Sequence, residues 1–314
     1  MRHPFEPVSQ RRRFFLAAGA ACLTPWPARA AQSSAPQVFH HPSAESSHDS
    51  RYQYDWEVLR MALERTEERY GPYAMEASEE KMTPARVTQE MLSTAEQSRL
   101  NVMVRATNPG LEQKLRPIRI PVDRGLLGFR IFLVRKANLP QFAAVRTLDD
   151  LRRLRAGQGR GWVDVQILQA AGLPVVEGSN YEGLFGMLQS QRFDYFSRAA
   201  DEALREFQER SSHFPELAIE PSLLLHYPLP RYFFVRRDAQ GGLLAERIES
   251  GLEAMLKEGS LQAVFLKHKA DLIARAGLSQ RRVLKIPNPT LSEQTPLARS
   301  ALWFDPFSGK TRQG

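Results

Sequence analysis

The chain has 314 residues, of which 42% are hydrophobic and 25% charged, a composition typical of a globular protein that buries a core. Its formal net charge is +8, and residues 1–30 supply +4 of this through five arginines and one glutamate, which leaves +4 for the rest of the chain. The remaining basic residues are interspersed with acidic ones and form no basic cluster with interleaved aromatics. The composition therefore excludes nucleic acid as an expected partner.

The N-terminus has the pattern of an export signal. Residues 10–31 read QRRRFFLAAGAACLTPWPARAA, a positive block followed by a short apolar run and the small-x-small sequence Ala28-Arg29-Ala30. The apolar run is too short for a membrane-spanning helix. Arg12 and Arg13, followed by Phe and Leu, resemble a twin-arginine signal, with an ordinary Sec signal as the alternative. We expect cleavage after Ala30 and a periplasmic location.

The single cysteine, Cys22, lies inside this signal. The chain after residue 30 therefore has no disulfide, no Cys-ligated metal and no Cys nucleophile. Lipid attachment at Cys22 is an alternative, although the usual Leu three positions before the Cys is missing.

Strands and helices alternate along the rest of the chain, which predicts an α/β protein with largely parallel sheets. Helix starts are marked by Thr83, Thr147 and Asn180, each placed as an N-cap. The tail after Arg281 is Pro-rich and is predicted to be irregular. The predicted strands are 37–41, 101–104, 129–134, 175–176, 193–196, 219–227 and 231–236. The predicted helices are 54–70, 84–98, one starting at 147, 163–171, 181–191, 199–210, 243–256, 261–268 and 270–276.

Three segments resemble bacterial periplasmic solute-binding proteins of family 3, which include amino-acid receptors. They are TLDDLRRLRAGQGRGW (147–162), MLQSQRFDYFSR (187–198) and RYFFVRRDAQGGLLAERIESGLEAMLKEGSLQAVFLKH (231–268). The resemblance implies the type II two-lobed α/β fold, in which each lobe is a mostly parallel sheet flanked by helices. A solute binds in the cleft between the lobes and is trapped by hinge closure.

Mapped onto this chain, the resemblance gives a division into four parts. Residues 1–30 are the signal peptide, and residues 277–314 are a Pro-rich C-terminal extension. Lobe one comprises 37–121 and 231–276, and lobe two comprises 128–226. Two crossover segments, 121–128 and 226–231, would join the lobes.

The stretch QGRGWVD (158–164) has glycines at alternate positions and precedes a predicted helix. The Gly-x-Gly-x-Gly spacing matches no dinucleotide fingerprint, and no Lys-Ser/Thr follows as in a P-loop. The resemblance implies that this turn faces the cleft and presents a helix N-terminus to an anionic ligand group. Gly161 would allow close approach and Trp162 would cover the ligand. Alternatively, Asp164 only caps the helix and Trp162 belongs to the core.

Lobe two offers three further candidate ligand contacts. Ser197 and Arg198 follow the predicted strand 193–196, and Arg198 could hold a carboxylate through two parallel hydrogen bonds. The alternative for Arg198 is an ion pair with Asp201 or Glu202. Arg130 opens the strand after the first crossover, with a salt bridge as its alternative.

Lobe one offers Ser43 and Tyr52 from a polar loop, and Thr107 and Asn108 after the predicted strand 101–104. In amino-acid receptors the latter region reads Thr-x-x-Arg, and that arginine binds the α-carboxylate. Here Thr107-Asn108-Pro109-Gly110-Leu111 has no arginine at the matching place, which puts an α-amino-acid ligand in doubt. His40, His41 and His48 match no usual metal-ligand spacing, so we expect neither a metal nor another cofactor.

These features predict a monomeric binding protein for a small polar or anionic solute. Its partner would be the permease of an ABC transporter or a membrane sensor. The sequence contains neither a Gly-x-Ser-x-Gly elbow nor His-Glu-x-x-His. Two alternatives stay open: an exported enzyme on the same fold, which would need a cleft carboxylate of raised pKa, and a scaffold protein with a non-functional cleft.

Overall fold

The computed structural model describes residues 35–44, 52–94 and 97–308. The predicted export signal, with Arg12, Arg13, Cys22 and the cleavage point after Ala30, lies outside these residues. So do residues 45–51 of the polar loop, which include His48. Within the described ranges, no helix combines the length and the apolar character needed to cross a membrane.

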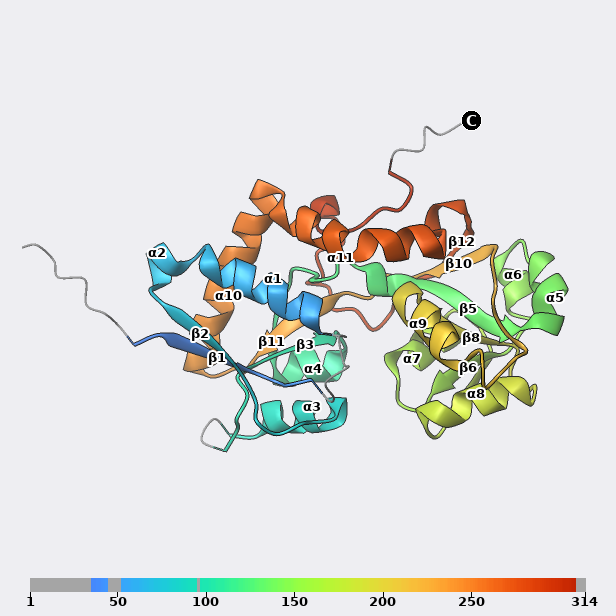
Figure 1. Ribbon diagram of the computed structural model, residues 1–314, viewed down its shortest axis with the longest axis horizontal. Coiled ribbons are helices and arrows are strands. Elements are labelled where there is room, and N and C mark those ends of the chain that lie inside the picture. Colours follow the sequence, from blue (N-terminus) through green and yellow to red (C-terminus); the bar gives the residue numbers. More distant parts are fainter. Residues whose placement is uncertain (1–34, 45–51, 95–96, 309–314) are drawn as a thin grey trace, which may run out of the picture. The chain divides into compact units, whose positions relative to one another are not determined.

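The strands form separate sheets that divide the chain into two α/β lobes (Figure 1). Residues 121–128 connect lobe one, after its strand β4 Arg116–Ile118, to lobe two. Residues 226–231 connect lobe two back to lobe one. The two-lobed α/β fold predicted from the sequence is thus confirmed. The residue limits given above for each lobe remain a proposal.

Lobe one has a parallel pair, β1–β2, and a three-stranded sheet in which β11 lies between β3 and β4 and runs antiparallel to both. The strands are β1 Gln37–His41, β2 Tyr73–Ala77, β3 Val102–Ala106, β4 Arg116–Ile118 and β11 Arg231–Val235. The helices are α1 Gln53–Glu64, α2 Glu67–Tyr70, α3 Pro84–Leu92, α4 Pro109–Lys114 and α10 Ala239–Glu258. The next helix, α11 Ser260–Ala276, packs against both α10 and α9 Ala200–Arg210 of lobe two.

Lobe two has one seven-stranded sheet in the order β12-β10-β5-β8-β6-β7, with β9 also paired to β5. Its strands are β5 Phe129–Arg135, β6 Ala156–Gly159, β7 Val175–Gly178, β8 Tyr195–Ala199, β9 Leu217–Ile219, β10 Leu223–His226 and β12 Arg282–Lys285. Its helices are α5 Leu139–Ala143, α6 Leu148–Leu151, α7 Val163–Ala170, α8 Tyr181–Gln189 and α9 Ala200–Arg210.

Two predictions about these sheets were wrong. The pairing is mixed rather than mostly parallel, because β5 runs antiparallel to β8, β9 and β10. The returning half of the chain also places β11 antiparallel to its neighbours in lobe one. The tail, predicted to be irregular, contributes β12, which pairs in parallel with β10.

The helix starts follow the predicted caps. The side chains of Thr83, Thr147 and Asn180 each accept a hydrogen bond from a backbone N–H of the first turn, and Thr147 forms a full capping box with Asp150. The predicted helix 54–70 is instead two helices, α1 and α2.

The glycine stretch 158–164 starts in a buried strand, β6, that ends at Gly159, and the predicted turn follows at residues 160–161 before α7 begins at Val163. At Gly157 a Cβ atom would lie 2.2 Å from the Phe193 ring, and at Gly159 it would lie 2.4 Å from the Trp162 indole. These two glycines are needed for close packing of aromatic side chains against the strand.

Candidate functional site

Arg198 is a buried side chain of β8, and its guanidinium already binds a carboxylate of the same chain. Its Nη2 lies 2.7 Å from Glu206 Oε1, and its Nε lies 3.0 Å from both Glu206 oxygens. Arg198 Nη2 also lies 3.3 Å from Glu202 Oε2. Burial opposes the charged form of Arg198, but Glu202 and Glu206 outweigh it and raise the Arg198 pKa. The ion pair with Glu202 that was expected as the alternative is formed, but the main partner of Arg198 is Glu206, which was not predicted, and the pair is buried.

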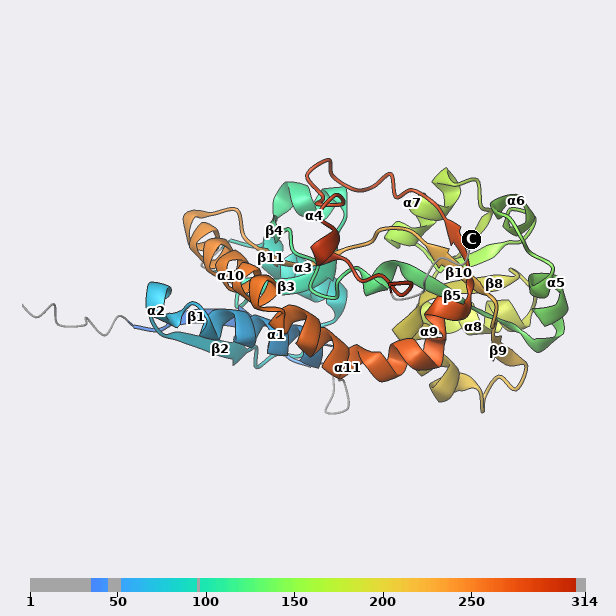
Figure 2. The ribbon, with the colours of Figure 1, turned by 90° about the horizontal axis from the view of Figure 1, so that it is seen from above.

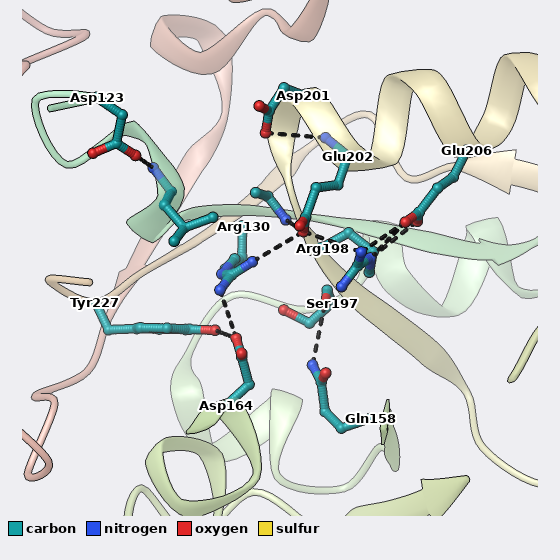
Figure 3. A network of polar contacts seen from close by, with 12 residues as sticks. Asp123, Arg130, Gln158, Asp164, Ser197, Arg198, Asp201, Glu202, Glu206 and Tyr227 are labelled. Carbon is teal, nitrogen blue, oxygen red and sulfur yellow. Dashed lines mark hydrogen bonds and ion pairs between the residues drawn. The ribbon is translucent and has the colours of Figure 1, made fainter. Parts of the chain in front are cut away.

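Arg130, on β5, is held in a similar way. Its Nη2 lies 2.7 Å from Asp164 Oδ1, and its Nη1 lies 3.4 Å from Glu202 Oε2. The Tyr227 hydroxyl donates to the same Asp164 oxygen. Figure 3 shows how these side chains form one connected set with Arg198. We call the six residues of this set the arginine network: Arg130, Asp164, Arg198, Glu202, Glu206 and Tyr227.

Trp162 and Gly161 lie at the start of α7, beside this network. The Arg198 guanidinium carbon is 4.9 Å from the centre of the Trp162 ring, within the range of a cation–π contact. Trp162 also stacks on Phe196 with ring centres 6.2 Å apart. Gly161 has a φ of +76° and open space beside it, so the backbone conformation explains this glycine. The structure thus gives Trp162 a protein cation as its partner.

Ser197 lies inside β8 and not after it, because the strand starts two residues later than predicted and ends at Ala199. Ser197 and Gln158 are both fully buried. Gln158 Nε2 donates to the Ser197 backbone oxygen at 3.0 Å. Ser197 Oγ and Gln158 Oε1 have no hydrogen-bond partner among the described residues.

The candidate contacts of lobe one serve the local fold. The Thr107 hydroxyl donates to Glu112 Oε1 at 2.5 Å, and Asn108 caps α4. The Ser43 hydroxyl donates to the Glu80 backbone oxygen at 3.3 Å. The structure does not bring these three side chains together with the lobe-two candidates in any hydrogen bond or ion pair of the described residues.

Tyr52 contacts Arg231, which belongs to a second group of polar residues that sequence reasoning missed. The Arg231 guanidinium carbon lies 5.2 Å from the centre of the Tyr52 ring. Arg231 Nη2 lies 3.0 Å from Asp55 Oδ2. Arg231, at the end of the second crossover, and Asp55 on α1 help to line a small cavity of about 10 Å³, which is about the space that one water needs. We call its polar lining residues the crossover cluster: Tyr54, Asp55, Asp123, Asp201, Arg231 and Lys269.

Asp123 is the member of the crossover cluster that comes from the first crossover. Its carboxylate accepts the backbone N–H of Gly125 at 3.1 Å and of Leu127 at 2.9 Å. It has no ion-pair partner within 4.0 Å among the described residues. Burial raises the pKa of Asp123, against the opposing charge of Arg231 and the two backbone hydrogen bonds.

Asp55 is the most strongly perturbed carboxylate of this cluster. Burial raises its pKa to about 6, although the Arg231 charge opposes the rise. The contact with Arg231 lacks hydrogen-bond geometry, so both Asp55 oxygens remain without a hydrogen-bond donor in the described ranges. Such a buried acceptor is costly unless a water or a ligand group supplies the missing hydrogen bond.

The remaining members complete the lining of the cavity. Lys269 Nζ, from α11, lies 3.9 Å from Asp201 Oδ2, at the start of α9. It also lies 5.2 Å from the centre of the Tyr54 ring. The cluster thus has three carboxylates against two cationic groups, Arg231 and Lys269, and carries an excess negative charge when all groups are ionised.

The sequence contained only a weak signal for this cluster. Asp123 stands in the predicted crossover PVDRG, a sequence typical of a turn, and the sequence predicts Asp201 only as a partner of Arg198. The burial of Asp55, on which the electrostatics depend, comes from tertiary packing. No group of three or more His, Cys, Asp or Glu side chains in the described ranges is arranged to hold a metal ion.

Comparison with protein-family models and with curated protein sequences found no match. Solved structures do resemble the chain. They include a Salmonella typhimurium periplasmic binding protein with high arginine specificity (14% identity, TM-score 0.49, covering 74% of this chain and 98% of that chain). An ancestral arginine-binding protein bound to glutamine has 17% identity and a TM-score of 0.49, covering 74% and 98%. A histidine kinase sensor domain similar to periplasmic binding proteins has 14% identity and a TM-score of 0.49, covering 75% and 96%. These similarities concern the fold alone.

Proposed function

We propose that the chain is an exported binding protein that captures a small polar solute with a positively charged group, such as an ammonium. The observation that carries this proposal is the crossover cluster. It gathers three carboxylates, two of them with raised pKa values, around a cavity at the two segments that join the lobes. A cationic group placed there would supply donors to Asp55 and balance the charge of Asp123.

The arginine network argues against the anionic solute expected from the sequence. That expectation depended on a helix N-terminus after the glycine stretch and on Arg198 or Arg130 being free to bind a carboxylate. Glu206 occupies the guanidinium of Arg198, and Asp164 occupies that of Arg130. An anionic solute would have to displace a buried internal carboxylate, which leaves that group without its partner at a cost of several kcal/mol.

The cavity also favours hinge motion as the route of capture. A volume of about 10 Å³ is too small for an organic solute. Because residues of both crossovers line it, a rotation about these segments would open it, and closure would bury the bound group. The periplasmic location, and the delivery of the solute to an ABC permease or a membrane sensor, remain parts of this proposal.

The test is a binding screen on the chain expressed from Ala31. Thermal shift and calorimetry would compare diamines, basic amino acids and quaternary amines with dicarboxylates and neutral sugars. We expect a ligand-dependent rise in Tm only in the amine classes. Asp201→Asn should lower the affinity by about tenfold or more, the loss expected for one charge-assisted hydrogen bond.

The matched control is Asp149→Asn, whose side chain is 79% exposed and pairs with Arg152. It should leave the affinity unchanged. A Tm rise with dicarboxylates alone would contradict the cationic assignment. Silence in every class would favour the scaffold alternative, in which the cleft binds no solute.

Asp55 also keeps the enzyme alternative open. A buried carboxylate with a pKa of about 6, lining a cavity, is the feature that an acid–base catalyst on this fold would need. Incubation of the binding ligand with the protein, followed by mass spectrometry, separates the two functions. Recovery of the ligand unchanged supports binding. Conversion that is lost in Asp55→Asn supports catalysis.

A further inference from the structure

The segment that follows β12, residues 286–308, runs along both crossovers (Figure 2). It begins next to lobe two, where the Ile286 N–H donates to the His226 backbone oxygen at 3.0 Å. Asn288 then donates from Nδ2 to the Pro228 backbone oxygen at 2.8 Å, within the second crossover. We call residues 286–308 the C-terminal strap.

Further on, the strap contacts lobe one. Arg119 Nη2 donates to Gln294 Oε1 at 3.0 Å. Both terminal nitrogens of Arg299 lie 2.5 Å from oxygens of Glu253 on α10. The contacts with Arg119 and Glu253 thus fix the strap to lobe one, and its start directly after β12 fixes it to lobe two.

The end of the strap packs against the first crossover and forms hydrogen bonds with it. The Phe304 N–H donates to the Arg124 backbone oxygen at 2.7 Å. Arg124 Nη2 in turn donates to the backbone oxygen of Ala301 at 3.0 Å. Trp303 packs on Gly125 so closely that a Cβ atom there would lie 2.5 Å from the indole. The Phe304 ring also packs against Phe265 of α11, with ring centres 5.3 Å apart.

The two crossover residues that contact the strap, Arg124 and Gly125, have an unusual backbone conformation. Arg124 and Gly125 have φ angles of +53° and +77°. The left-handed region is unfavourable for a residue with a side chain, so Arg124 needs outside contacts to stay there. The strap supplies such contacts at both its backbone oxygen and its guanidinium.

This conformation also determines where the Asp123 carboxylate lies. Asp123 immediately precedes Arg124, and its oxygens accept the N–H groups of Gly125 and Leu127. If Arg124 and Gly125 left the left-handed region, these two donors would point elsewhere. The carboxylate would then lose its fixed place in the crossover cluster.

We propose that the C-terminal strap is a positioning element for the solute site: Trp303 and Phe304 hold the first crossover so that Asp123 faces the bound cationic group. This role rests on the proposed function. The hold of the strap on the crossover can be measured without any solute.

The experiment uses Trp303→Ala in the chain expressed from Ala31, with hydrogen exchange of the amides of residues 121–128 as the first measurement. We expect the Gly125 and Leu127 amides to exchange faster by about tenfold or more, because they lose fixed acceptors. The matched control, Leu297→Ala, lies in the same segment, but Leu297 is 51% exposed. It should leave these amides unchanged.

The second measurement is the affinity for the amine found in the screen. Trp303→Ala should weaken it by about tenfold, and Trp303→Phe, which keeps an aromatic ring on Gly125, should recover part of the loss. A purely structural tail would lower Tm in Trp303→Ala while the crossover amides and the affinity stayed at their wild-type values. That result would overturn the proposal.

Because Trp303→Ala could prevent folding, a charge reversal provides a second route. Arg299→Glu opposes Glu253 and should speed exchange at the crossover, and the double change with Glu253→Arg should restore it. Failure of the double variant to restore slow exchange would count against the strap. If the strap variants exchange faster at the crossover but the wild-type chain binds no solute, the proposed function is wrong. The positioning of Asp123 by the strap is then still supported.

Discussion

The two polar groups of this molecule each combine three carboxylates with two cationic groups, but their carboxylates receive hydrogen bonds in different ways. In the arginine network each guanidinium has a carboxylate within 2.7 Å, from Glu206 for Arg198 and from Asp164 for Arg130. In the crossover cluster, Asp55 lacks hydrogen-bond donors in the described part of the chain, and Asp123 has only backbone donors. In the first arrangement the guanidiniums supply donors to their carboxylates without a ligand, whereas in the second Asp55 still needs a donor, which a cationic group would supply.

The comparison shows that an arginine at the expected place is a poor marker of an anion site. Pairing decides whether its charge is available, and pairing is a property of the fold. A buried carboxylate at a hinge that lacks hydrogen-bond donors, such as Asp55, is the stronger indication, because a buried acceptor without a donor is costly.

The largest effect is expected from removing one partner of the arginine network. Arg198→Ala would leave Glu206, whose side chain is 1% exposed, without its cation. We expect a loss of about 3–5 kcal/mol in the free energy of unfolding, measured by urea denaturation. In the double variant Arg198→Met with Glu206→Leu, most of this stability should return, since no buried charge is then left unpaired. A loss below about 1 kcal/mol in Arg198→Ala would mean that Arg198 is free and available for a ligand after all.

The next effect concerns Asp55 and has the opposite sign. Burial raises its pKa from 3.8 to about 6, so the folded state binds this proton more tightly than the unfolded state. The associated stability is therefore present below about pH 4 and is lost as the pH rises through 6. The whole interval corresponds to at most on the order of 3 kcal/mol.

Asp55→Asn should consequently stabilise the protein at pH 7 and have little effect at pH 4. The charged groups around it are Arg231, Lys269, Asp123 and Asp201. Urea denaturation of the variant and the wild-type chain at both pH values measures this. Destabilisation by Asp55→Asn at pH 7 would show that the ion pair with Arg231 outweighs burial, and the cluster would then be as complete as the arginine network.

Sequence reasoning predicted the fold because its signals are local or periodic. The caps at Thr83, Thr147 and Asn180 and the alternation of strands with helices suffice for an α/β protein, and the family resemblance supplied the two lobes. It missed β12 because a four-residue strand in a Pro-rich tail is stabilised by its pairing with β10 and not by its own pattern.

The site was less predictable, for a physical reason. Ser197 and Arg198 were expected after a strand but lie within β8, where neighbouring side chains point to opposite faces of the sheet. The partners of Arg198 and Arg130 come from α7 and α9, and Asp55 and Asp123 are 68 positions apart in the sequence. Burial and pairing over such distances carry no local pattern.

The smallest effect tests whether the crossover cluster already contains a competitor for the solute. Lys269 lies 3.9 Å from Asp201, and both side chains are partly exposed. Such a pair contributes only about 0–1 kcal/mol to stability, so Lys269→Met should barely change the urea midpoint. It should nevertheless raise the affinity for a cationic solute several-fold, since a like charge facing the bound ammonium is removed. Calorimetry with the amine found in the screen measures this, and Lys267→Met, two positions earlier on α11 and paired with Glu57, is the matched control.

A weaker affinity in Lys269→Met would show instead that Lys269 itself contacts the solute, which would then carry an acceptor beside its positive charge. The crossover cluster would in that case recognise both signs, and the contrast with the arginine network would rest on Asp55 and Asp123 alone.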